Sequence, residues 1–80
     1  MPKLPRDLSG RELANAMRRD GWIERDLGRK QRTGSHNIGL IKPGFPPMVI
    51  VDHPVLKPGT LRRYLRDAGL TVEQLLALLR

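Results

Sequence analysis

The chain has 80 residues, of which 39% are hydrophobic and 29% charged, and it contains no cysteine. A chain this short builds one modest core, so we expect a single domain over residues 1–80, with residues 1–7 as a flexible N-terminus. Its apolar runs are far shorter than the roughly 20 residues that span a bilayer, which excludes a membrane helix. The lack of cysteine and of an apolar leader favours the cytoplasm and excludes thiol catalysis.

Positive charge is concentrated in the middle of the chain. Fifteen Lys and Arg against eight Asp and Glu give a formal net charge of +7, and between Leu27 and Arg66 eight basic side chains face Asp52 alone. This stretch predicts a polyanionic partner. The alternative is a solvated surface whose charge only keeps the protein soluble. A membrane surface is not expected, because the basic residues are spread over several segments and not along one amphipathic helix.

The first predicted element is a helix over about residues 10–20. Ser9 and Glu12 stand at the spacing of a capping box, and Leu8 and Leu13 at that of a hydrophobic staple. Gly21 supplies the left-handed position that commonly ends a helix.

Three extended segments follow this helix. They cover residues 22–27, 35–42 and 48–52, and are separated by a polar loop over 28–34 and a proline-rich turn over 43–47. Three strands in succession predict an antiparallel meander. Gly39 weakens the middle strand, and we expect it to mark either a bulge or the close approach of a neighbouring backbone.

Two more helices complete the pattern. Before Gly69, which ends the second helix, apolar residues recur at helical spacing: Leu61, Tyr64, Leu65 and Ala68. Thr71 and Gln74 repeat the capping-box spacing ahead of a short third helix. A sheet of this size needs helices on one face to make a core. The predicted fold class is therefore α+β, a two-layer sandwich in the order α-β-β-β-α-α with a three-stranded antiparallel sheet.

The order of these features resembles a known protein family. The resemblance rests on Asp20-Gly21-Trp22, Gly34-Ser35-His36, Asp52-His53-Pro54, the run from Lys57 to Arg63, and Asp67-Ala68-Gly69-Leu70. Over about residues 8–78 the chain is similar to the HicA family of toxins. The resemblance implies a fold like that of double-stranded-RNA-binding domains, cleavage of mRNA without a metal or other cofactor, His36 as the catalytic residue, and neutralisation by a HicB-like antitoxin.

RNA cleavage makes modest chemical demands on a protein. The 2′-hydroxyl is a built-in nucleophile, so the protein must supply a base for its proton and positive charge for the transition state. Histidine suits proton transfer at neutral pH, and the chain offers only His36 and His53. His36 follows a basic loop that we expect to draw in the RNA backbone through Arg29, Lys30, Arg32, Gly34 and Ser35. The alternative for His36 is a polar residue at a strand start, hydrogen-bonded to nearby backbone.

A second group of candidates lies near the start of the second helix. A cation beside a helix N-terminus attracts phosphate, which predicts RNA contacts from Lys57, Thr60, Arg62 and Arg63. The alternative is that Pro58 and Gly59 turn the chain and Thr60 caps the helix. His53 is a candidate second acid or substrate contact, with Asp52 placed to orient its ring.

Several other side chains have a structural and a functional interpretation. Trp22 and Tyr64 either stack on bases or belong to the core, and the small number of aromatic residues in the chain favours the core. The leucines near the C-terminus are expected in the core or at an interface: Leu75, Leu76, Leu78 and Leu79.

Three classes of function stay open at this point. The first is a ribonuclease toxin, and the second is a non-catalytic double-stranded-RNA-binding module of the same fold. The third is a small interaction domain whose charge serves an acidic protein. No metal site is assigned to any of them.

Overall fold

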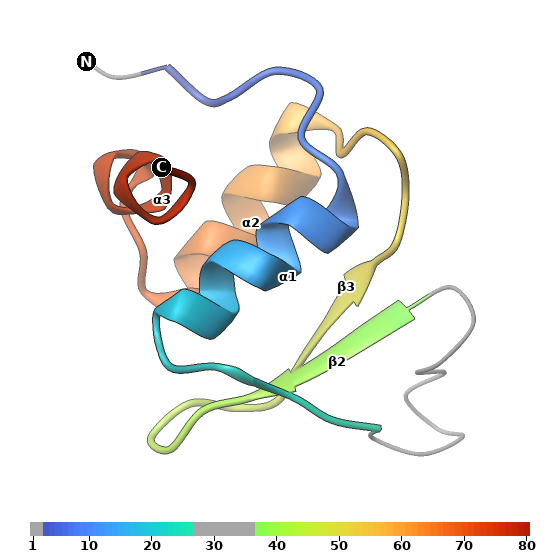
Figure 1. The fold of residues 1–80 in the computed structure, drawn as a ribbon, viewed down its shortest axis with the longest axis vertical. Helices are drawn as coiled ribbons and strands as arrows, with labels where there is room; N and C mark the ends of the chain where they lie inside the picture. The colour runs from blue at the N-terminus through green and yellow to red at the C-terminus, as the bar shows by residue number, and fades with distance from the viewer. Residues whose placement is uncertain (1–2, 27–36) are drawn as a thin grey trace.

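The fold is an α+β arrangement of three helices and a three-stranded antiparallel sheet, as the sequence predicts. The structure is a computed structural model that describes residues 3–26 and 37–80. Its elements, in chain order, are α1 (Gly10–Arg19), β1 (Ile23–Glu24), β2 (Asn37–Ile41), β3 (Met48–Val51), α2 (Pro58–Ala68) and α3 (Val72–Leu78). The helices lie on one face of the sheet, with α3 packed beside α1 (Figure 1).

Two of the three helices begin with the predicted capping boxes. The Ser9 hydroxyl accepts a hydrogen bond from the Glu12 N–H (3.0 Å), and the Glu12 carboxylate accepts one from the Ser9 N–H (3.2 Å). Thr71 and Gln74 do the same at the start of α3. Each box satisfies backbone donors that a helix start otherwise leaves unpaired. These local bonds fix where α1 and α3 begin.

The start of α2 differs from the prediction that Thr60 caps it. Lys57 occupies the N-cap position and makes no side-chain capping bond, Pro58 is the first helical residue, and Thr60 lies inside the first turn. Proline suits this place because its φ is already helical and its missing N–H has no partner to lose there. The capping interpretation of Thr60 is therefore wrong. Gly69 ends α2 with a φ of +69°, in the left-handed region, as predicted.

The sheet has the order β1-β2-β3 with antiparallel pairing throughout. β1 is only two residues long, shorter than the predicted extended segment. At its start, the Trp22 N–H donates to the Met17 carbonyl at the end of α1 and not to the sheet. The β2–β3 register runs through the Gly39–Val49 pair without an extra residue, which contradicts the bulge interpretation of Gly39.

The core lies between the sheet and the helices. Its fully buried side chains come from every layer: Leu13, Met17, Trp22, Leu40, Ile50, Leu61 and Leu75. Tyr64 is also buried, so the core interpretation of both Trp22 and Tyr64 is confirmed. Of the C-terminal leucines, Leu75 is in the core and the other three are half-buried. No helix in the described part of the chain is long and apolar enough to cross a membrane.

Candidate nucleic-acid interface

The predicted site residues divide into two groups. His36 and the loop residues Arg29, Lys30, Arg32, Gly34 and Ser35 lie outside the described residues. The other five are described, and they sit around the end of β3 and the start of α2: His53, Lys57, Thr60, Arg62 and Arg63. The described candidates therefore lie on α2 and on the loop that precedes it.

Four of these five residues share one pocket. It has a volume of about 280 Å³, and His53, Lys57, Thr60 and Arg63 all line it. Its remaining lining is Val51, Val55, Leu56 and the ring of Tyr64. Arg62 is not among the lining residues, although it is exposed on the same helix. The lining thus combines a histidine, a lysine, a threonine and an arginine with apolar residues.

Tyr64 joins the two elements that form this pocket. Its hydroxyl accepts a hydrogen bond from the Val51 N–H (3.2 Å), while its ring is buried between α2 and β3. The Arg63 guanidinium lies over the same ring, 5.5 Å from its centre, within the range of a cation–π contact. Tyr64 therefore sets the spacing of α2 from β3 and supports the Arg63 side chain at the pocket.

The loop between β3 and α2 is held from the other side by the start of α1. The Gly10 N–H donates to the His53 carbonyl (2.9 Å), and the Leu56 N–H donates to the Leu8 carbonyl (2.8 Å). Gly10 is packed so closely that a Cβ there would lie 1.9 Å from the Val51 carbonyl oxygen. These contacts fix the backbone of His53 relative to the helices.

Gly10 and Tyr64 position this site, a role that the sequence did not indicate for either residue, since Tyr64 was considered only for base stacking or the core. The available signal for Gly10 was a glycine at the first position of a helix, where alanine is the better helix former. For Tyr64 it was a hydroxyl on an otherwise apolar helix face. Neither signal identifies its partner, because the partner lies far away in the sequence.

The start of α2 is electrostatically open. It has no acidic residue in its first turn and no side-chain cap, whereas α1 and α3 each carry a glutamate and a capping box. The N–H groups of Gly59 and Thr60 thus form part of the positive end of the helix dipole, and no side chain caps them. Lys57 adds a full charge at the same place. This is the local chemistry that attracts phosphate oxygens.

Two acidic side chains of the described residues, Glu24 and Asp20, form ion pairs with cations that do not line this pocket. Arg11 pairs with Glu24 at 2.7 Å, and this hydrogen bond raises the pKa of the Arg11 guanidinium, with burial opposing it and the charges of Glu24 and Asp52 adding to it. Among the described residues, no hydrogen bond joins Asp52 to the His53 ring, so the orienting role predicted for Asp52 is not observed. Asp20 binds Lys42 at 3.1 Å on the other side of the molecule.

Metal-ligating groups are scattered within residues 3–26 and 37–80. No three His, Asp or Glu side chains of these segments are close enough together to hold a metal ion. No family model matches the chain, and no curated protein matches it. The family resemblance therefore rests on the motif residues alone.

Proposed function

We propose that the protein is an RNA-cleaving toxin, a ribonuclease that acts on mRNA and is neutralised in the cytoplasm by a HicB-like antitoxin. The observation that carries the RNA-binding half is the pocket in which His53, Lys57, Thr60 and Arg63 meet at an open helix N-terminus. The cleavage half rests on the resemblance of the Gly34-Ser35-His36 motif. The two halves are separable, and each has its own test.

The pocket supports RNA binding through the chemistry of its groups. A phosphate placed between Lys57 and Arg63 would receive two charge-assisted contacts and face the free N–H groups of the first turn of α2. The apolar side chains that line the pocket suit the sugar or the edge of a nucleobase. Arg62, one residue along the helix, would extend the contact to a neighbouring phosphate.

The proposed chemistry assigns separate roles to the two histidines. His36 takes the proton of the 2′-hydroxyl as general base, and the cations of the pocket stabilise the developing charge on the phosphate. His53 is the candidate for protonating the departing 5′-oxygen, because it shares the pocket with Lys57 and Arg63. Its exposed position allows it to exchange protons with water. Two histidines in these roles would give a bell-shaped dependence of rate on pH.

The test separates cleavage from binding. His36→Ala is expected to reduce the single-turnover rate on a labelled RNA by about 10²- to 10⁴-fold, because a positioned base is lost, while the Kd for RNA changes little. Arg62→Ala is the matched control with the opposite signature, a raised Kd and a rate at saturating protein close to wild type, because Arg62 lies outside the pocket and is proposed to contact a neighbouring phosphate only. Circular dichroism checks that both variants are folded.

The results also decide between the open classes of function. If the His36→Ala variant cleaves RNA as fast as wild type, the proposed base is wrong. If the wild-type chain binds duplex RNA tightly and never cleaves it, the non-catalytic RNA-binding module replaces the toxin. If His53→Ala lowers the rate as severely as His36→Ala, the two histidines act as an acid–base pair.

A further inference from the structure

The free edge of β3 is open at one residue. β3 lies at the edge of the sheet, and the Val51 N–H points away from β2, since it donates to the Tyr64 hydroxyl. In an antiparallel pair the backbone groups of alternate residues point the same way. The Val49 N–H and C=O therefore also point outward, and they pair with no strand of the described sheet.

The chain protects this edge on both sides of Val49. Upstream, Pro46 and Pro47 have no N–H to donate. Downstream, Tyr64 takes the Val51 N–H, and Gly10 packs directly against the Val51 carbonyl oxygen. Proteins commonly block their edge strands in these ways to prevent pairing with other chains. Within the described part of the chain, neither kind of block covers the N–H and C=O of Val49.

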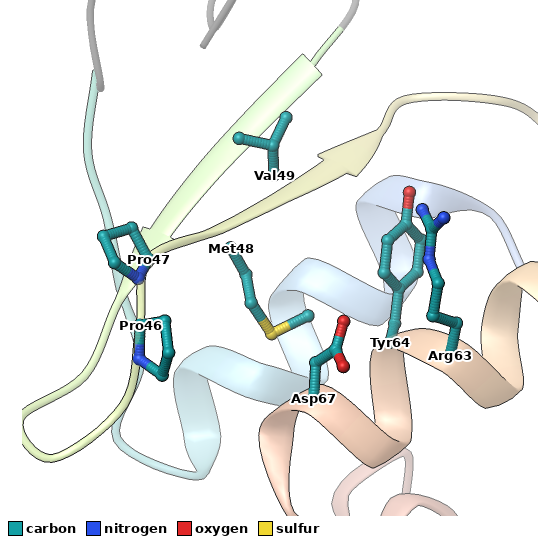
Figure 2. A pocket seen from close by; sticks show the side chains of 7 residues that line it. All are labelled: Pro46, Pro47, Met48, Val49, Arg63, Tyr64 and Asp67. Atoms are coloured by element: carbon teal, nitrogen blue, oxygen red, sulfur yellow. The ribbon is translucent and has the colours of Figure 1, made fainter.

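A groove runs beside this open residue. It has a volume of about 480 Å³ and lies between the edge of β3 and α2, with Val49, Pro46 and Pro47 on one side and Arg63 and Asp67 on the other (Figure 2). An extended peptide that pairs with Val49 would lie along this groove and turn alternate side chains toward the helix. The groove is thus shaped for a short additional strand.

The charges beside the groove select the kind of peptide. The charged residues that line the groove are Arg63 and Asp67, and Arg62 and Arg66 are exposed next to them on α2. This part of the helix therefore carries three arginines against one aspartate. A second copy of this chain would bring the same arginines up to this helix and be repelled. We propose that the β3 edge binds an extended acidic segment of a partner protein, which adds to the sheet as a fourth strand at Val49. The proposal goes beyond the ribonuclease function and does not require it.

The test uses the full chain and a short labelled peptide that alternates threonine and glutamate. Fluorescence anisotropy should show that Val49→Pro weakens binding about tenfold, because it removes the edge N–H while leaving the bonds to β2 in place. Val49→Ala is the matched control, which keeps the N–H and should bind nearly as wild type. Arg63→Glu should also weaken binding. A peptide that alternates threonine and lysine should bind much more weakly than the acidic one.

A second measurement covers the case in which Val49→Pro does not fold. Hydrogen exchange of the Val49 amide in the wild-type chain should slow at least about tenfold when the acidic peptide saturates it, since the N–H becomes hydrogen-bonded. An unchanged exchange rate overturns the proposal, and so does equal binding of the acidic and basic peptides. Sedimentation that shows a dimer of this chain, lost in Val49→Pro, would make a second copy the occupant and also overturn it.

Discussion

At the scale of single residues, two glycines in helix first turns have opposite surroundings. Gly10 begins α1 against the backbone of Val51, and a Cβ there would lie 1.9 Å from the carbonyl oxygen. Gly59 lies in the first turn of α2, and a Cβ there would meet nothing within 4 Å. The close contact at Gly10 helps to hold the backbone around His53, whereas the space around Gly59 is free.

We therefore expect Gly10→Ala and Gly59→Ala to change stability in opposite directions. Gly10→Ala forces α1 away from β3, and we expect it to lower the free energy of unfolding by about 1–3 kcal/mol. Gly59→Ala should raise it by about 0.5–1 kcal/mol, because alanine is the better helix former where its methyl group meets no obstacle. Urea denaturation measures both. Equal stability of the two variants would contradict the close packing described at Gly10.

At the scale of elements, α2 is the helix whose start has no side-chain cap. α1 and α3 gain from capping boxes, while the N-cap position of α2 holds Lys57, which cannot accept a hydrogen bond from the helix N–H groups. A residue that is poor for helix stability but suited to phosphate binding is consistent with a functional role at this position. Under the proposed function, the Lys57 side chain would favour RNA binding at the expense of helix stability.

Lys57→Asp tests this competition directly. Aspartate is a good N-cap and complements the helix dipole, so we expect the free energy of unfolding to rise by about 0.5–2 kcal/mol. The same change should weaken RNA binding, because it replaces a cation in the pocket with an anion. Lys3→Asp makes the same charge change at an exposed residue near the N-terminus, and should weaken binding less. If both variants bind RNA equally, Lys57 has no specific role in the pocket.

At the scale of the whole molecule, the fold holds several unpaired cations close to one another. The net charge is +7, and the described cations without an acidic partner within ion-pair distance include Lys57, Arg62 and Arg63 around one end of α2. The sheet and helices hold these groups on a rigid frame. A polyanion that meets this frame releases counterions, which makes its affinity depend on salt.

RNA affinity should therefore fall steeply with salt. If four or five phosphates are contacted, a rise from low to moderate salt should weaken binding by roughly a hundredfold. Arg63→Gln should reduce the slope of log Kd against log salt by about 1, since one phosphate contact is lost. Anisotropy titrations over a series of salt concentrations measure both quantities. Affinity that does not respond to salt would favour an acidic protein as the partner of this charge.

Local features of the fold were predictable from the sequence because they depend on residues three or four positions apart. Ser9 with Glu12 and Thr71 with Gln74 form their capping boxes within one helical turn, and Gly69 ends α2 by its own backbone freedom. The element order and the fold class followed from these starts and stops. The interpretation of Thr60 as the cap of α2 was wrong, because Pro58 begins the helix and the cap position falls on Lys57, three residues earlier.

Features that join distant parts of the chain were decided by the tertiary structure. The Tyr64 bond to Val51, the packing of Gly10 against the same residue and the shared pocket of His53 and Arg63 all depend on how α1 and α2 settle on β3. The sequence by itself determined which charged and polar side chains were available. Only the packing of the core determined which of them lie close together. Burial of the apolar faces of the helices fixes how each helix lies on the sheet, and this sets the direction in which its exposed side chains point.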